Sequence, residues 1–372
     1  LDFNRFQADA TFLGLKKLNL NNGDLQPDLL REKLFLDFTS KFMAALRAVH
    51  VRVYVNDVYW GLYIAVEQPD KTMMRSRFGK DEDGNLYEAV EFQGDLSYLG
   101  MDPAAYRRRH ELETNETTGD YSDLISFIDI LNNTPTAQLP QRLGPICDVE
   151  NMLGAIAVNV LFTNLESYLG SAGEYYLYHR DDTGKFVYIH WDANETFGTT
   201  GDGTPRIANP FTFDPFWLPT AATGPGGGGM GGTARPLMQK LWAVDSYKRL
   251  YLRLLARMLR EGFDAATMEA RIRELADRIR ADVYADPNKL FSNAQFEAAL
   301  TSQLSAGGQG GPVPGGGTVL YGLVQFVRER YNFLRPYLNA LAAPSDVRLN
   351  ELMTVNSGGD PWLEIHNLGP VR

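Results

Sequence analysis

The chain has 372 residues, 44% of them hydrophobic, so it can bury a large core, and its length favours two lobes over one compact unit. Its formal net charge of -10 argues against nucleic acid or an anionic membrane as the main partner, because either would require a basic surface. The single cysteine, Cys147, excludes an internal disulfide and a cysteine-rich metal site. No apolar run is long enough to span a bilayer. Because no signal-like segment precedes Leu1, we expect a piece of a longer protein.

The first seventy residues predict a small mixed β lobe. Residues 11–20 alternate in their second half as a half-buried strand does, and Asp28 is a suitable N-cap for an amphipathic helix over 29–46. Residues 49–66 then alternate on both sides of a central polar pair, which predicts a β-hairpin. A polar connector over 67–70 follows. Strand, helix and hairpin in this order form a sheet that could cover a nucleotide.

The middle of the chain places oxygen-bearing side chains at the ends of two elements. Residues 148–165 have helical periodicity and are followed at once by Glu166. A hairpin over 175–190 ends in Asp192, with Asn194 two residues later. Carboxylate and amide oxygens of this kind are suited to a hard divalent cation held against a polyphosphate. The sequence therefore points toward phosphoryl transfer.

The C-terminal third predicts helices interrupted by two glycine-rich inserts. The inserts lie near 224–232 and 307–317 and cannot form packed elements. The predicted helices cover 236–260, 265–286, 293–304 and 319–341, the last bent near Pro336. Short strands are expected again over 349–353 and 362–367, as the beginning of a further unit.

Seven ordered segments together resemble the CotH kinase family of spore-coat protein H-like atypical protein kinases. The resemblance rests on segments 12–22, 30–32, 51–63, 67–70, 84–87, 175–178 and 191–198. It implies an α+β, two-lobed, kinase-like fold, with a nucleotide-covering lobe over 1–70 that is truncated at its start and a mostly helical catalytic lobe over 71–342. Residues 345–372 resemble the start of a lamin-tail-type β domain.

The resemblance also implies roles for the residues around Asp192. It places Asp192, Glu174 and Asn194 as ligands of Mg²⁺ or Mn²⁺, and Glu166 as the catalytic carboxylate near the acceptor hydroxyl. Glu166 stands where the family usually has Asp, Glu174 where it has Asn, and Asn194 where it has a second Asp. The longer Glu side chains displace their carboxylates, which weakens the inference from fold to activity.

Two further sites follow from the same comparison. Lys17 would contact the phosphates of ATP and be steadied by Glu32, in the way a strand lysine and a helix glutamate act in kinases. Glu67 and Gln68 would form the hinge beside the adenine. The alternatives are that Lys17 is a solvated strand residue, that Glu32 is an ordinary first-turn carboxylate, and that 67–70 is a plain exit turn.

The same alternatives apply to the acidic residues, since Asp192 could merely cap a turn and Glu166 could be a surface carboxylate. The favoured hypothesis is a secreted or surface-attached bacterial kinase that phosphorylates Ser or Thr of a protein substrate with ATP. A pseudokinase, or a structural surface module, is the second hypothesis. A metal-dependent hydrolase is the third. The sequence leaves the oligomeric state open.

Overall fold

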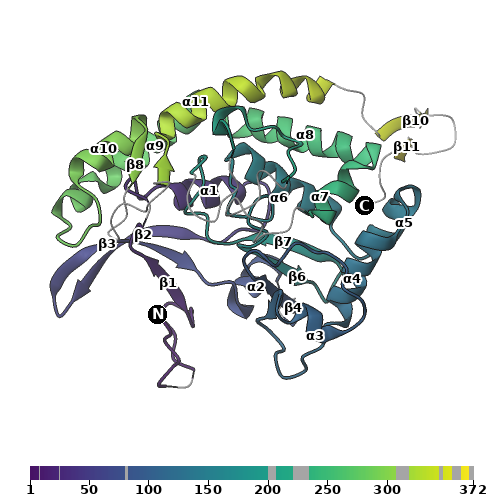
Figure 1. The fold of residues 1–372 in the computed structure, drawn as a ribbon, viewed down its shortest axis with the longest axis horizontal. Coiled ribbons are helices and arrows are strands. Elements are labelled where there is room, and N and C mark those ends of the chain that lie inside the picture. Colours follow the sequence, from purple (N-terminus) through teal and green to yellow (C-terminus); the bar gives the residue numbers. More distant parts are fainter. Residues whose placement is uncertain are drawn as a thin grey trace.

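The computed structural model describes residues 1–7, 9–24, 26–79, 83–199, 207–220, 234–306, 318–342, 347–353 and 362–367. Both predicted glycine-rich inserts lie outside these ranges. The chain contains a three-stranded sheet of order β1-β3-β2 and a four-stranded sheet of order β5-β4-β6-β7, with most of the helices gathered along one side (Figure 1). Among the described residues, no helix is long and apolar enough to cross a membrane.

The hairpin of the small sheet forms as predicted. Strand β2 (Ala48–Val55) pairs antiparallel with β3 (Val58–Glu67). The two residues between them, Asn56 and Asp57, have φ of 50° and 62°. Positive φ at both positions is the conformation of the two-residue turn that matches the twist of a hairpin, and Asn and Asp tolerate it better than other non-glycine residues.

Strand β1 (Leu18–Asn21) is much shorter than the predicted strand over 11–20. It pairs antiparallel with the end of β3. The preceding residues instead make a tight turn in which Phe12 and Leu15 bond to each other through both backbone groups, at 2.9 Å each. Gly14 permits this turn with φ of 83°. Of the predicted second half of this segment, only residues from Leu18 onward form the strand, and the strand prediction was wrong for the residues just before it.

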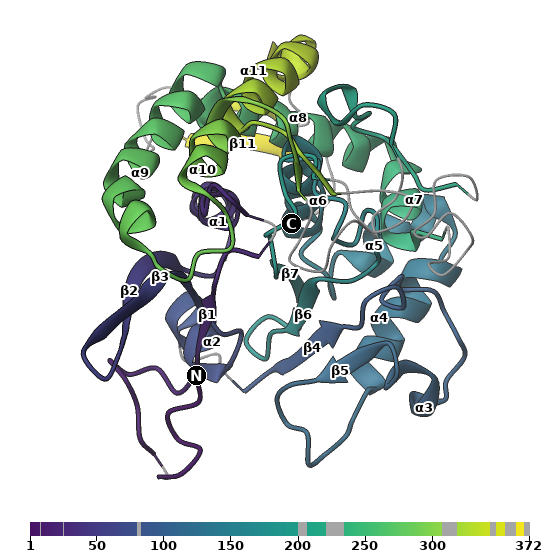
Figure 2. The ribbon, with the colours of Figure 1, turned by 60° about the vertical axis from the view of Figure 1, so that its left-hand side comes forward.

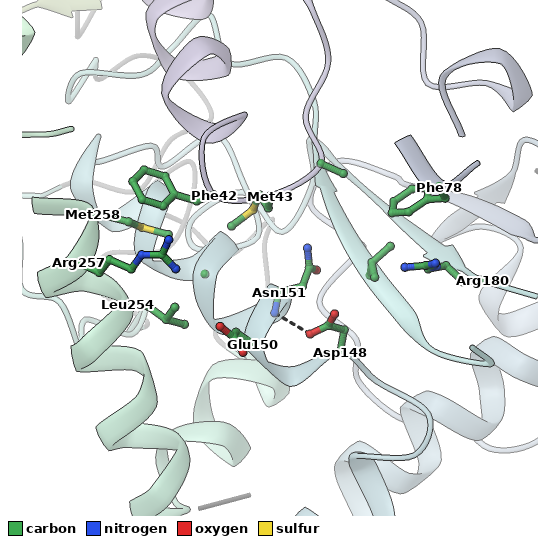
Figure 3. A pocket seen from close by; sticks show the side chains of 13 residues that line it. Phe42, Met43, Phe78, Asp148, Glu150, Asn151, Arg180, Leu254, Arg257 and Met258 are labelled. Carbon is green, nitrogen blue, oxygen red and sulfur yellow. Dashed lines mark hydrogen bonds between the residues drawn. The ribbon is translucent and has the colours of Figure 1, made fainter. Parts of the chain in front are cut away.

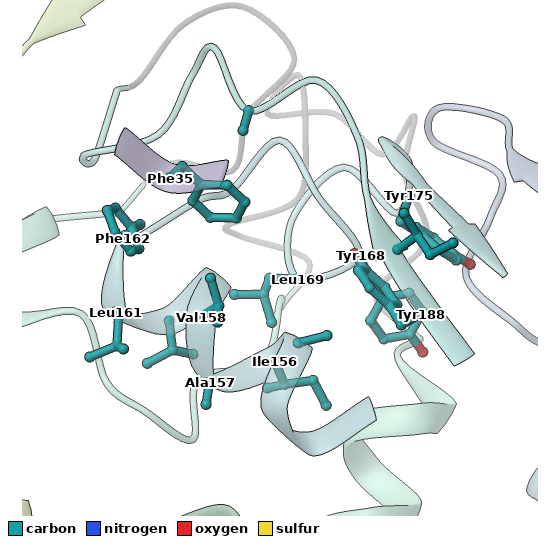
Figure 4. Close-up of a cluster of buried hydrophobic side chains, with 14 of the residues drawn as sticks. Phe35, Ile156, Ala157, Val158, Leu161, Phe162, Tyr168, Leu169, Tyr175 and Tyr188 are labelled. Atoms are coloured by element: carbon teal, nitrogen blue, oxygen red, sulfur yellow. The ribbon is translucent and has the colours of Figure 1, made fainter. Parts of the chain in front are cut away.

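Helix α1 (Arg31–Thr39) links the two halves of the protein. The N-cap position is Leu30 rather than the predicted Asp28, although the Asp28 carboxylate just before it accepts the backbone N–H groups of Leu30 and Arg31 at 2.9 and 3.2 Å. The helix ends at Thr39 rather than at residue 46. Its buried ring of Phe35 packs edge-on against Phe162, which follows the central helix of the larger half (Figure 4). α1 therefore belongs to the core of both halves.

The four-stranded sheet consists of β4 (Asn85–Ala89), β5 (His110–Leu112), β6 (Tyr175–His179) and β7 (Phe186–His190). All of its neighbours are antiparallel, and the predicted hairpin is the β6–β7 pair. The central helix α6 (Val149–Leu161) is capped by Asp148, which accepts the Asn151 N–H at 3.0 Å. Buried tyrosines of β6 and β7 lie beside this helix in the core (Figure 4).

The other described elements surround these sheets. The small helices are α2 (Lys71–Phe78), α3 (Pro103–Tyr106), α4 (Ser122–Asn133), η1 (Thr136–Gln138), α5 (Leu139–Leu143) and η2 (Pro210–Thr212). The C-terminal helices are α7 (Pro236–Trp242), α8 (Asp245–Glu261), α9 (Ala265–Ala285), α10 (Asn293–Thr301), α11 (Leu323–Leu334) and η4 (Arg335–Ala342). Short strands are β8 (Leu304–Ala306), β9 (Thr318–Leu320), β10 (Val347–Met353) and β11 (Trp362–Asn367).

These elements refine the predicted helices. The helix expected over 236–260 is divided between α7 and α8, and the helix expected to bend near Pro336 changes there from α to 3-10 geometry. The last two strands are present, as expected, and the structure pairs them with each other. Their pairing alone does not test the predicted lamin-tail-type domain.

Candidate functional site

Six carboxylates converge between the two sheets. Asp192 follows β7, Glu195 lies in the same loop, and Glu166 follows α6. Of the other three, Glu174 precedes β6, Glu91 follows β4, and Glu32 lies in the first turn of α1. We call this group the acid cluster, and its members are Glu32, Glu91, Glu166, Glu174, Asp192 and Glu195. Figure 2 shows α1, α6 and β7 near the centre of the molecule, with the small and the larger sheet on either side.

The members of the acid cluster are coupled electrostatically. Burial, and next the negative charge of Asp192, raise the pKa of Glu174 to about 8 and that of Glu32 to about 7. Burial is also the main cause that raises the pKa of Glu166, followed by the charges of Glu195 and Asp192. Like charges brought together in a low-dielectric site resist ionisation unless a cation neutralises them.

Several buried oxygen atoms in the cluster have no hydrogen-bond partner in the described structure. They are Glu166 Oε2 and Glu195 Oε2, and Asn194 Oδ1, in the loop between Asp192 and Glu195, likewise has none. An unsatisfied buried acceptor costs about 1–3 kcal/mol, so such atoms on Glu166 and on the loop after Asp192 require an explanation. A hard cation would satisfy acceptors of this type, and oxygen-only ligand sets suit Mg²⁺ and Mn²⁺.

The carboxylates are not a ready-made metal cage. Within the part of the chain that the structure describes, no three His, Cys, Asp or Glu side chains are placed as a ligand set. A bound Mg²⁺ ordinarily keeps several waters and shares its shell with phosphate oxygens, so it needs only one or two protein carboxylates. The donor chemistry of the acid cluster therefore fits a divalent ion that is bound together with a phosphate-bearing ligand.

The loop after β7 is held in an uncommon conformation. Asp192 has φ of 36° and Phe197 has φ of 61°, which side chains of these types rarely adopt. The Asp192 carboxylate accepts the Asn194 N–H, and Thr196 Oγ1 donates to the Ala193 carbonyl at 2.9 Å. Residues in sparsely populated backbone regions persist where surrounding contacts hold them, and they concentrate at functional sites.

The predicted pairing of Lys17 with Glu32 is corrected by the structure. Lys17 is exposed, precedes β1, and acts electrostatically on Glu113. The partner of Glu32 on β1 is Asn21, whose Nδ2 donates to Glu32 Oε2 at 2.8 Å. The first turn of α1, which begins at Arg31, faces the end of β1, which is Asn21, and Lys17 lies before the start of that strand. Glu32 itself is buried and accepts the Ala193 N–H, which joins it to the acid cluster.

The side chains of Glu67 and Gln68, the predicted hinge residues, form ion pairs and hydrogen bonds within the protein. Glu67 is 4% exposed and pairs with Arg47 at 2.7 Å and with Arg77 at 2.5 Å. Gln68 Oε1 accepts from Asn19 Nδ2 at 2.9 Å. These contacts fasten the end of β3 to α2 and β1. A nucleotide contact from residues 67 and 68 would therefore involve their backbone, as the predicted hinge requires.

Sequence reasoning missed two carboxylates of the acid cluster, and it missed Arg31, which bonds to the loop that carries Asp192. Glu195 was detectable, since it lies three residues after Asp192 in the same polar turn. Glu91 had no local signal, because it joins the cluster only when β4 pairs with β6. Arg31, fully buried beside Glu32, donates to the Thr196 carbonyl at 3.1 Å and so binds the loop that carries Asp192.

A pocket of about 270 Å³ lies at the opposite end of α6 from the acid cluster. Phe42 and Met43 line one side of it, and Asp148 and Asn151 at the start of α6 line its base (Figure 3). Its charged groups are engaged within the protein, for example Arg257, which pairs with Glu261 at 2.9 Å. This pocket is separate from the acid cluster.

The mixed α+β fold and the acid cluster between the two sheets are consistent with a kinase-like protein. A family model described as CotH kinase protein matches residues 1–304. The chain therefore belongs to the CotH kinase family, as the sequence motifs predicted. It is similar to the inner spore coat protein H of Bacillus subtilis (strain 168), with 28% identity over 296 residues, which cover 78% of this chain and 75% of that protein.

Proposed function

We propose that this protein is a divalent-metal-dependent kinase that transfers the γ-phosphoryl group of ATP to Ser or Thr of a protein substrate. The observation that supports this most is the acid cluster, in which mutual repulsion and orphaned oxygen atoms favour a cation. Membership of the CotH kinase family supports the same reaction. Because the relative's name places it in the spore coat, we also propose a location outside the cell or on its surface.

The residues of the cluster would divide the work between them. Asp192, Asn194 and Glu174 would hold Mg²⁺ or Mn²⁺, which when bound neutralises the charge of the phosphate oxygens. Glu166 would orient the acceptor hydroxyl and take its proton. Its raised pKa favours the protonated form at neutral pH, so Glu166 would act as a base only when positive charge at the site lowers that pKa.

Residues outside the cluster would bind the rest of the nucleotide. Glu32 would act by holding the Ala193 N–H and so the turn after Asp192, rather than by holding Lys17. Lys17, the exposed cation just before β1, is the candidate for contact with the phosphates. The backbone of residues 67 and 68, at the junction of β3 and the larger half, would face the adenine.

The test is phosphotransfer by the purified chain with labelled ATP, Mg²⁺ or Mn²⁺, and a generic Ser/Thr acceptor or the chain itself. Asp192→Asn should reduce the rate at least about 100-fold, because it removes a charge that acts only where the metal binds. Glu274→Gln, which alters an exposed carboxylate on α9, should leave the rate unchanged. Equal activity of wild type and Asp192→Asn would contradict the proposal.

A pseudokinase is the second candidate, and Glu166 and Glu174 favour it because they replace the usual Asp and Asn of the family. The two functions are separated by measuring nucleotide binding and phosphotransfer on the same preparation. A rise in melting temperature with ATP and Mn²⁺, without label transfer, would favour the pseudokinase. In that case Glu166→Asp should restore transfer, since it moves the carboxylate to where the family places it.

A further inference from the structure

The guanidinium of Arg31 is buried and makes four hydrogen bonds. Its Nε donates to Asp28 Oδ2 at 2.9 Å, and both partners of this ion pair are 0% exposed. Its Nη1 donates to the Thr196 carbonyl at 3.1 Å and to Thr199 Oγ1 at 3.2 Å, and its Nη2 donates to the Tyr321 carbonyl at 2.6 Å. One side chain thus connects α1 with the loop after β7 and with the residues before α11.

Two of these acceptors lie on the loop of residues 192–199, which carries the proposed metal ligands. Thr199 Oγ1 in turn donates to the Thr196 carbonyl at 2.9 Å, so Arg31 binds a closed turn rather than a single free atom. The neighbouring Glu32 accepts the Ala193 N–H near the start of the same loop. The first turn of α1 therefore holds the loop on both sides of Asn194 and Glu195.

The loop needs such support for two reasons. Its residues Asp192 and Phe197 have positive φ, and each costs of order 1–3 kcal/mol that surrounding contacts must offset. Its carboxylates also repel each other and Glu166. The Arg31 guanidinium meets the first need, because it supplies a planar set of donors to the loop and lies 5.8 Å from the centre of the Phe197 ring. Its charge is paired with Asp28.

We propose that Arg31 is a positioning residue of this site, which fixes the loop of residues 192–199 so that its two proposed ligands, Asp192 and Asn194, direct their oxygen atoms toward one divalent cation. The proposal rests on the proposed function in that it assumes a cation in the acid cluster. It adds a requirement for the geometry of Arg31, beyond its charge. A lysine at this position keeps the charge but cannot bond all four acceptors at once.

The experiment measures binding of Mn²⁺ alone to the full chain, from the loss of the free-ion electron paramagnetic resonance signal. Arg31→Lys should weaken binding about tenfold, the size expected when hydrogen bonds to a charged group are lost. Thr199→Val removes one acceptor of Arg31 and should weaken binding about threefold. Thr199→Ser keeps the hydroxyl and should bind like the wild type.

Arg330→Lys is the control for a general loss of packing. Arg330 is also fully buried and donates to backbone carbonyls, at 2.8 Å to Val160 and 2.7 Å to Phe213, but it does not bond to the loop of residues 192–199. It should lower the melting temperature as Arg31→Lys does while leaving the Mn²⁺ affinity within about twofold. If Arg31 only stabilised the fold, Arg31→Lys and Arg330→Lys would change the Mn²⁺ affinity by the same factor.

The outcomes separate this inference from the proposed function. If wild type and Asp192→Asn fail alike to bind Mn²⁺, the proposed metal-dependent function is rejected. If the wild type binds Mn²⁺ through Asp192 but Arg31→Lys and Thr199→Val bind equally well, only the positioning role is overturned. Should Arg31→Lys fail to fold, the comparison of Thr199→Val with Thr199→Ser decides the question.

Discussion

Single carboxylates in the acid cluster lower the stability of the metal-free protein. Burial and neighbouring negative charge raise the pKa of Glu174 to about 8 and also raise the pKa of Glu166. An unfolded glutamate titrates near pH 4.5. Between that pH and the raised pKa, the folded chain binds more protons than the unfolded chain, so the free energy of unfolding falls as the pH rises.

Glu166→Gln should therefore stabilise the metal-free protein at pH 8 and have little effect at pH 5. At pH 8 the unfolded chain ionises Glu166 freely, whereas the folded state keeps it protonated or ionises it unfavourably, and the amide removes that difference in free energy. We expect its melting temperature in chelator to exceed that of the wild type by about 2–4 °C, which corresponds to roughly 1 kcal/mol in a domain of a few hundred residues. Saturating Mg²⁺ should stabilise the wild type more than the variant.

The control for this measurement is Glu274→Gln, on the exposed face of α9. Hydrogen bonds from Arg271 lower the pKa of Glu274, so its substitution should not stabilise the protein at either pH. If the difference in melting temperature between wild type and Glu166→Gln is the same at pH 5 and at pH 8, then the ionisation of Glu166 does not destabilise the folded protein.

At the scale of elements, the small sheet is fastened to the C-terminal helices as well as to α2. Asp286, just after α9, is buried and accepts the Leu62 N–H of β3 at 2.9 Å. Gly61 permits this approach, because a Cβ at that position would lie 2.8 Å from both Asp286 carboxylate oxygens. Asn288 Nδ2 also donates to the Trp60 carbonyl at 2.6 Å. The small sheet is thus attached to α2 on one side and to the residues after α9 on the other, and the acid cluster lies between this sheet and the larger one.

Asp286→Ala should reduce the free energy of unfolding by about 2–3 kcal/mol, because it leaves the buried Leu62 N–H without an acceptor. Asp282→Ala, in the last turns of the same helix, is a matched comparison. It removes an ion pair with Arg52, which is 60% exposed, and should cost no more than about 1 kcal/mol. Denaturant unfolding measures both values. Equal losses would show that Asp286 contributes only as a surface charge.

At the scale of the whole molecule, the two sheets share one core. Buried side chains from α1, β3, α6 and α11 belong to a single hydrophobic cluster. α11 is tied to the centre by Arg330, which donates to the Val160 carbonyl at the end of α6. The last two strands, β10 and β11, pair with each other. We therefore expect residues 1–342 to unfold together and the tail to contribute little to their stability.

A chain ending at residue 343 should keep the melting temperature of the full chain within about 2 °C, whereas a chain ending at residue 322 should not fold. The second deletion removes α11, including Leu323, Phe326 and Arg330, which are all fully buried. Loss of several such side chains costs far more than the 5–15 kcal/mol by which domains are stable. Circular dichroism during heating measures both. A large drop for the first deletion would contradict the predicted boundary near residue 345.

The sequence by itself determined the features that depend on neighbours along the chain. Alternation of apolar residues defined both hairpins, and helical periodicity beginning at Asp148 located the start of α6. The same local reasoning placed Asp192 at a strand end, and the ordered motifs indicated the CotH kinase family. These signals are readable because pairing across a hairpin and hydrogen bonding within a helix involve residues close in sequence.

Only the tertiary structure decided which side chains share the site. Lys17 just before β1 and Asn21 at its end are both polar, and the position of α1 determines that Asn21 bonds to Glu32. Arg31 is an ordinary helix residue until the chain brings it to the Thr196 carbonyl, 165 positions later. Contacts of that separation depend on the packing of whole elements. No pattern within a short window of sequence determines that packing.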